Sequence, residues 1–323
     1  MEINEKNIKL WSTLGPRATL GLAINDYAKD NENFMVLTSD VSTSAGLDRF
    51  KKNYPEKYID VGIAEQNLMG IAAGIASEKF KVLTTTFAPF QTMRCNEQIK
   101  VNLGYMKNKV CMIGIASGLI LGNLGYTHCC IEDVGALRSI PNLKIISPAD
   151  SLETIKALES TLNNLDTSVY IRLTGGSNNP IVYNTDYVFD IGKSIKLVDG
   201  SDITVISCGS MVYNAIEVSK LLKKQNISCS VINMHTIKPI DKVAIKDACN
   251  SKLVVTIEEH NVIGGLGSAV AEELSKYKNK SKFLPIGIQD QYTGGGDYKF
   301  LLRKHDLDIE GIFNKIVENY KTT

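Results

Sequence analysis

The sequence predicts an α/β protein made of two doubly wound domains, each a parallel β-sheet with helices on both faces. Short apolar runs bounded by turn residues alternate with longer stretches of helical period along the whole chain. A cluster of turn-forming residues at 175–180 interrupts this alternation. With 323 residues, 44% of them hydrophobic, the chain can bury two cores of ordinary size.

In the first half, the apolar runs predict strands near residues 35–38, 82–86, 110–116, 144–147 and 169–173. The stretches of helical period predict helices over residues 17–29, 65–77, 90–103 and 151–163. The last of these helices has a capping signal, because Asp150 precedes it and Glu153 follows three residues later.

The residues Gly175-Gly176-Ser177-Asn178-Asn179-Pro180 cannot lie inside a helix or a central strand. We therefore place the domain boundary shortly after them, which divides the chain into residues 1–188 and 189–323. Beyond the boundary the alternation predicts strands at 203–208, 229–233, 253–257 and 283–288, and helices at 211–224, 240–249, 266–277 and 309–320.

The composition narrows the class of protein. Lysine and arginine (36) nearly balance aspartate and glutamate (35) and are scattered, so we expect no nucleic-acid partner, although small anionic substrates remain possible. No apolar stretch has the length of a signal peptide or a membrane span, so we expect no membrane association and a cytoplasmic location. Seven widely spread cysteines fit reduced thiols.

The stretch Gly62-Ile63-Ala64-Glu65-Gln66-Asn67 places one carboxylate at the start of an apolar, Gly/Ala-rich helix. A predicted strand and the aromatic pair Phe87 and Phe90 follow soon after it. This order suits a flat heterocycle, because a glutamate can hold a proton against a ring nitrogen while an aromatic ring stacks on the face. Thiamine diphosphate is the cofactor that needs both. A carboxylate stabilised by the helix dipole and plain core aromatics would explain the same residues structurally.

Further motifs extend this pattern over nearly the entire chain: Thr84-Thr85-Thr86-Phe87, Gly125-Tyr126-Thr127-His128, Pro141-Asn142-Leu143, Ser147-Pro148-Ala149-Asp150, Ile257-Glu258-Glu259-His260 and Gly264-Gly265-Leu266-Gly267-Ser268-Ala269. In register, the motifs of the first half resemble the pyrimidine-binding domain of transketolases and of 1-deoxyxylulose-5-phosphate synthases. Those of the second half resemble the C-terminal domain of the same family.

The resemblance implies roles for five residues. Glu65 would be the buried carboxyl that protonates the aminopyrimidine of thiamine diphosphate, a role that an apolar pocket favours because burial disfavours the charged form. Phe87 and Phe90 would pack on that ring, and Met93 would line the pocket. His128 would stand near the reacting carbonyl and move its proton. Cysteines 129 and 130 beside it also suggest a metal, but adjacent cysteines rarely share one tetrahedral site.

The resemblance also implies a substrate site. Arg17, Ser44 and Arg172 align with family positions that bind the sugar phosphate. Leu124 stands where the family has an aspartate that reads substrate stereochemistry, and Ala116 replaces a phosphate-binding histidine. An apolar residue at 124 removes a hydrogen-bond acceptor for a sugar hydroxyl, so we expect a deoxy, branched or nucleotide-linked acceptor.

Family members carry a further domain that binds the diphosphate and Mg²⁺ through Gly-Asp-Gly and a downstream asparagine. The nearest pattern here, Asp199-Gly200 with Asn226, lacks the first glycine and precedes a predicted strand. The chain therefore looks like the smaller subunit of a split transketolase. We expect the metal ligands on a separate partner chain and an α2β2 assembly.

Two other functions remain open. The β subunit of a 2-oxo acid dehydrogenase decarboxylase has the same two domains and a similar length, although the segment Gly125 to Asn142 fits transketolase better. A noncatalytic scaffold that kept the fold is the other alternative, against which Glu65, Phe87 and His128 together argue. The predicted C-terminal domain offers no clear chemistry, and Glu258 to His260 are as well suited to an interface.

Overall fold

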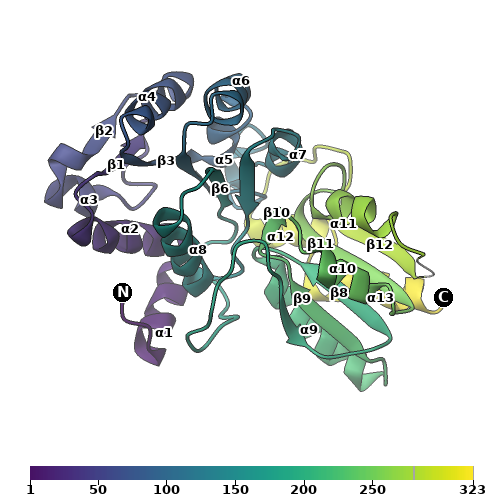
Figure 1. The fold of residues 1–323 in the computed structure, drawn as a ribbon. Helices are drawn as coiled ribbons and strands as arrows, with labels where there is room; N and C mark the ends of the chain where they lie inside the picture. Colours follow the sequence, from purple (N-terminus) through teal and green to yellow (C-terminus); the bar gives the residue numbers. More distant parts are fainter. Residues whose placement is uncertain (279–280, 323) are drawn as a thin grey trace.

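The computed structural model describes residues 1–278 and 281–322 and contains two α/β domains, each built on its own β-sheet (Figure 1). The predicted fold class is confirmed. No helix in these described ranges combines the length and the apolar character needed to cross a membrane.

The first sheet has seven strands in the order β10-β5-β6-β4-β3-β1-β2. All neighbours pair in parallel except β10, which runs antiparallel to β5 at the edge. The strands are β1 (Phe34–Thr38), β2 (Tyr58–Asp60), β3 (Lys81–Phe87), β4 (Val110–Ile115), β5 (Leu143–Ile146), β6 (Ser168–Arg172) and β10 (Thr236–Lys238).

Helices cover both faces of this sheet. Successive strand residues alternate between two apolar clusters, as Val82 and Leu83 do, which is the period-2 pattern of a strand buried on both sides. One cluster takes in α1 (Glu5–Leu14), α2 (Pro16–Tyr27) and α8 (Ser151–Asn163), and the other takes in α4 (Glu65–Ser77), η3 (Ile99–Tyr105) and α7 (Asp133–Arg138). The short helices α3 (Asp48–Asn53), α5 (Ala88–Gln91) and α6 (Asn96–Gln98) complete the domain.

The second sheet has five strands in the order β12-β11-β8-β9-β7, and only the edge strand β7 is antiparallel. Helices α9 and α13 pack in the apolar cluster on one face, and α10 and α11 in the cluster on the other. The elements are β7 (Ile195–Val198), β8 (Ile203–Ser207), β9 (Cys229–Asn233), β11 (Leu253–Asn261), β12 (Lys282–Ile288), α9 (Met211–Lys224), α10 (Lys242–Ala248), α11 (Leu266–Leu274), α12 (Tyr298–Lys304) and α13 (Ile309–Tyr320).

One predicted helix is wrong. Residues 90–103 do not form a single helix, because α5 ends at Gln91 and a turn separates it from α6 and η3. The regular i→i−4 hydrogen bonds stop after Thr92: Arg94 N donates to the carbonyl of Pro89 and Cys95 N to that of Thr92, both at 3.2 Å. The break matters because it presents Met93 and Arg94 on a turn.

The two halves share structure across the predicted boundary. Strand β10 comes from the second half but completes the first sheet, and Ser147 N donates to the carbonyl of His235 just before it (2.7 Å). One apolar cluster runs from Leu68 of α4 to Leu266 of α11 without interruption. The boundary at residue 188 stays a prediction, and the two domains pack as one body through this shared core.

We predict that His235 makes the fold sensitive to acid. Its buried ring stacks on Phe189 with centroids 4.2 Å apart, and burial lowers the pKa of His235 to about 4, outweighing the nearby Asp190 and Asp241. The unfolded chain takes up this proton near pH 6.5. Stability should therefore be complete above pH 6.5 and decrease as the pH falls toward 4, by up to about 3 kcal/mol.

The check is the free energy of unfolding, measured in urea at several pH values between about 7 and 4.5. His235→Gln stays neutral over this range, so its stability should depend less steeply on pH than that of the wild type, whatever its stability at pH 7. Equal slopes for the two proteins would contradict the assignment.

Candidate active site

Glu65 is the first residue of α4 and is buried, with 4% of its surface exposed. Its carboxylate does not face a purely apolar pocket, in contrast to the expectation from the sequence. Arg94, on the turn between α5 and α6, places its Nη1 2.7 Å from Glu65 Oε2. The environment of Glu65 is therefore a cationic partner on one side and the apolar body of the helix on the other.

Arg94 connects this carboxylate to the aromatic residues. Its guanidinium carbon lies 4.0 Å from the centroid of the Phe90 ring, a cation–π contact. The Phe90 ring in turn meets Phe87 edge to face (6.2 Å between centroids) and His128 edge to face (5.3 Å). Four of these residues were predicted for the site, and the structure brings them together. Arg94 was missed, although an arginine four residues after Phe90 was a signal available in the sequence.

His128 lies on a tight turn, in which its N–H donates to the carbonyl of Gly125 (3.0 Å). Its ring is partly exposed, with Nδ1 3.0 Å from the hydroxyl of Thr127. The next two residues are buried, and burial raises the pKa of the Cys129 thiol to about 11 and that of Cys130 well above its ordinary value. These thiols stay protonated at neutral pH, so they behave as core residues rather than as metal ligands.

Two further predicted site residues are exposed apolar side chains. Met93 is 48% exposed on the turn beside Arg94, and Leu124 is 57% exposed at the end of the short helix η4 (Gly122–Leu124). Neither is engaged in the core, so both are accessible to a substrate, a cofactor or another chain. Their roles remain predictions.

Arg17 and Ser44 line one cavity of about 340 Å³, together with residues of the segment 175–177. Arg17 lies in the first turn of α2, and no side chain of the described residues caps the start of this helix. The backbone N–H groups of that first turn and the Arg17 guanidinium therefore lie at the same edge of the cavity. Burial lowers the pKa of Arg17, but a guanidinium remains charged at any physiological pH. This combination suits a phosphate group. Ala116, in contrast, is fully buried.

Arg172 has a different role from the one that the sequence suggested. It was expected to bind the sugar phosphate, but it is 2% exposed and its Nε contacts both carboxylate oxygens of Asp133 at 2.9 Å. Its Nη2 donates to the carbonyls of Cys130 (3.2 Å) and Glu259 (2.8 Å). A buried guanidinium needs such partners, so Arg172 is part of the internal framework and does not line the cavity of Arg17.

Comparison with known proteins agrees with this two-domain fold. The family described as "Transketolase, pyrimidine binding domain" matches residues 13–179, and "Transketolase, C-terminal domain" matches residues 192–312. The chain belongs to the transketolase family. The family prediction is thereby confirmed, and membership implies group transfer of the transketolase type with dependence on thiamine diphosphate.

Relatives of similar length share this organisation. The chain is 36% identical to a putative transketolase C-terminal section from Methanocaldococcus jannaschii, covering 95% of this chain and 96% of the relative. It is also 36% identical to one subunit of the apulose-4-phosphate transketolase of Phocaeicola vulgatus, covering 92% and 94%. A solved structure described as a split gene transketolase in the form of an inactive β4 tetramer superposes with a TM-score of 0.85 at 32% identity, over 95% of this chain and 98% of that one.

We predict that the partner of Arg172 is required for stability. Asp133→Asn leaves a buried guanidinium without its counter-charge and should lower the free energy of unfolding by about 3 to 5 kcal/mol. The matched control is Glu272→Gln, which removes the partner of Arg138 at a site where the carboxylate is 61% exposed. That change should cost about 1 kcal/mol or less.

Both variants are measured as the isolated chain in urea, without cofactor or substrate. If Arg172 served to bind phosphate, replacing Asp133 would leave the stability of the isolated chain unaffected. A loss below about 1 kcal/mol for Asp133→Asn would therefore overturn the structural role of Arg172.

Proposed function

We propose that this chain is the smaller subunit of a two-chain transketolase, which moves a two-carbon ketol unit between sugars with thiamine diphosphate. The observation that carries the proposal is the convergence of Glu65, Phe90 and His128 from three separate segments: Arg94 links Glu65 to Phe90, and Phe90 contacts His128 directly. A carboxylate, an aromatic face and an imidazole are the groups that such a reaction needs at one place.

The residues present fit the aminopyrimidine ring of the cofactor. The guanidinium of Arg94 is itself flat, and it contacts both the Glu65 carboxylate and the Phe90 face. A flat heterocycle with a basic ring nitrogen likewise offers a face for Phe90 and a nitrogen for the Glu65 carboxylate. When bound, thiamine diphosphate supplies the carbon that accepts and releases the two-carbon unit. Glu65 would hold the proton at the ring nitrogen. For this, its carboxylate would have to break its ion pair with Arg94 or bind Arg94 and the ring at the same time. Phe87 and Phe90 would orient the ring.

His128 is placed to act on the substrate. Its partly exposed imidazole lies beside the same aromatic ring that would hold the cofactor, so it could transfer a proton to or from the substrate. Arg17 and Ser44 would bind the phosphate of the sugar in their cavity. Leu124, four residues before His128, would face the sugar. Because its side chain offers no hydrogen-bond acceptor, it would select against sugars with a hydroxyl at that position.

The proposal includes a partner chain that carries the diphosphate-binding domain and the ligands of Mg²⁺, in a cytoplasmic α2β2 assembly. Support comes from relatives of nearly the same length that are named as a subunit or a section of a transketolase. The structural relative described as an inactive β4 tetramer is consistent with a subunit that needs another chain for activity.

A second function is the β subunit of a 2-oxo acid dehydrogenase decarboxylase. The same carboxylate and aromatic pair would serve it. Pyruvate and an artificial electron acceptor, offered to the assembled complex, separate the two reactions, since a transketolase should give no reduction of the acceptor.

Glu65→Ala should lower turnover by the reconstituted complex on the order of 10²- to 10⁴-fold, because the ring nitrogen loses its proton partner. Glu97→Ala is the matched control, since that carboxylate is 69% exposed and pairs only with Lys100 within the described part of the chain. Steady-state assays with a ketose donor and an aldose acceptor make the measurement. Unchanged turnover by Glu65→Ala would favour a noncatalytic scaffold.

Thiamine diphosphate should bind tightly only to the mixture of this chain and its partner. Isothermal titration calorimetry with Mg²⁺ present compares each chain alone with the mixture. Tight binding by this chain alone would place the diphosphate site within it and would rule out the split arrangement.

The assembled enzyme should turn over xylulose 5-phosphate and ribose 5-phosphate poorly compared with deoxy, branched or nucleotide-linked sugars. Leu124→Asp restores an acceptor and should raise kcat/KM for the pentose phosphates about tenfold, the effect of one hydrogen bond. Leu124→Ala, which shortens the side chain without adding an acceptor, is the control. Wild-type activity on the two pentose phosphates equal to that of ordinary transketolases would exclude the selectivity.

A further inference from the structure

Residues 118–130 form a closed loop that carries His128, and we call this segment the His128 loop. Its two ends are joined by a pair of backbone hydrogen bonds between Gly118 and Cys130, of 2.8 and 2.9 Å. The loop belongs to the first half of the chain, yet much of it rests on the second domain.

Apolar side chains at both ends of the loop, and that of Ile131 just after it, are buried in the core of the second domain. Leu119, Cys129 and Ile131 belong to the same apolar cluster as the strands β8 and β11 and the helices α9 and α13. Glu259 of β11 accepts a hydrogen bond from Leu119 N at 2.6 Å. At Gly118, with φ of +74°, a Cβ would lie 2.2 Å from the Glu259 carboxylate, so only glycine allows this approach.

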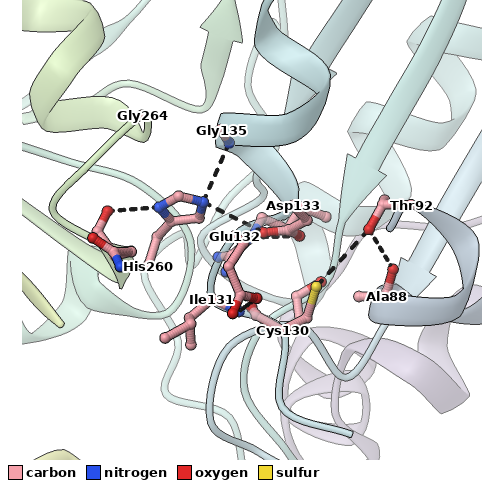
Figure 2. Close-up of polar contacts among 12 residues, drawn as sticks. Ala88, Thr92, Cys130, Ile131, Glu132, Asp133, Gly135, His260 and Gly264 are labelled. Carbon is pink, nitrogen blue, oxygen red and sulfur yellow. Dashed lines mark hydrogen bonds and ion pairs between the residues drawn. The ribbon is translucent and has the colours of Figure 1, made fainter. Parts of the chain in front are cut away.

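The base of the loop joins both domains. In Figure 2, Cys130 lies beside Thr92, which follows α5 of the first domain (3.9 Å between Sγ and Oγ1). Three residues further on, Asp133 Oδ1 lies 3.8 Å from Nε2 of His260, which also accepts from Gly135 N (3.3 Å). Contacts with both domains therefore hold the two ends of the loop in place.

The middle of the loop is held by the segment that follows β12. The hydroxyl of Tyr126 lies 3.0 Å from Thr293 Oγ1 and 3.1 Å from His305 Nε2, and these two atoms are 3.2 Å apart, so all three polar groups lie within hydrogen-bond distance of one another. The Tyr126 ring packs on Tyr292 with centroids 5.1 Å apart, and Tyr292 donates to Glu132 (2.6 Å).

A close backbone approach strengthens this contact. Gly296 N donates to the carbonyl of Gly122 at 3.1 Å, and a Cβ on Gly122 would lie 2.1 Å from Leu301 of α12. The opposite side of the loop faces the first domain, where His128 meets Phe90 and Phe87 at 5.3 and 6.3 Å between ring centroids. The loop is thus supported by one domain and presents its histidine to the other.

Tyr126 is coupled to His128 through the turn between them. Both His128 N and Cys129 N donate to the carbonyl of Gly125, which has φ of +77°. A displacement of Tyr126 therefore moves the backbone that carries the imidazole.

We infer that the C-terminal domain positions the proposed catalytic histidine, and that Tyr126, held by Thr293 and His305, is the positioning residue. The inference rests on the proposed role of His128. It assigns a task to a domain that contributes no group of its own to the Glu65, Phe90 and His128 cluster. Neither Tyr126 nor His305 contacts the reacting atoms in this scheme.

The test is a double-mutant cycle in the reconstituted complex, with Tyr126→Phe, His128→Ala and the double variant. Tyr126→Phe should lower kcat on the order of tenfold with KM and cofactor affinity little changed, because a misplaced imidazole affects the chemical step. In the His128→Ala background it should have no further effect. Tyr277→Phe is the control: it loses a hydrogen bond to Glu273 in the same domain, away from the loop, and should retain kcat.

A second measurement needs only the isolated chain. Amide hydrogen exchange at His128 and Cys129 should become faster in Tyr126→Phe, while exchange in α9 and β8 stays as in the wild type. Thr293→Val, which removes one of the two partners of the Tyr126 hydroxyl, serves as the second variant if Tyr126→Phe folds poorly, and should accelerate the same amides.

The outcomes separate the two ideas. Full turnover by His128→Ala would end the proposed role of His128, and with it this inference. Loss of turnover by His128→Ala combined with wild-type kcat for Tyr126→Phe would overturn the positioning role alone. Equal losses from Tyr126→Phe with and without His128 would show a general structural effect and would also overturn it. Faster exchange throughout the second domain would lead to the same conclusion.

Discussion

The buried pair of Arg172 and Asp133 is the interaction on which the rest of the structure depends. Arg172 ends β6, Asp133 begins α7, and Tyr170 donates to the same carboxylate at 2.7 Å. The second guanidinium nitrogen reaches the carbonyls of Cys130 and Glu259. One ion pair thereby joins the first sheet, a helix that covers it, the base of the His128 loop and the second domain. A charge at this depth is tolerated only because every one of these partners is in place.

This framework explains why the site lies where it does. Glu65 comes from the start of a helix, Phe87 and Phe90 from the end of β3 and from α5, and His128 from a loop supported by the other domain. In open α/β sheets, ligands bind beyond the carboxyl ends of the strands, where loops from several βα units converge. The Phe87 position at the end of β3 follows that rule. The C-terminal domain contacts the His128 loop through Glu259, Thr293 and His305.

The sequence allowed most of the fold and part of the site to be predicted. Strands buried on both faces and long amphipathic helices have strong local patterns, and the observed bounds of α4 and α8 coincide with the predicted ones. Short or edge elements such as β2, β7 and β10 carry too little periodicity to be recognised. The helix expected at 90–103 is interrupted after Thr92, where Arg94 N and Cys95 N donate to carbonyls five and three residues back, an irregularity that apolar spacing does not report.

The sequence by itself determined the family and the alternation of strands and helices, because these depend on local order and on motifs in register, and it predicted Glu65, Phe90 and His128 as site residues. Only the tertiary structure decided which charged groups meet. Arg172 became internal because Asp133, far from it in sequence, lies opposite it, whereas Arg94 became a neighbour of Glu65 because the chain turns after α5. A guanidinium has the same chemistry in either place, and its burial and partners, which come from folding, set its role.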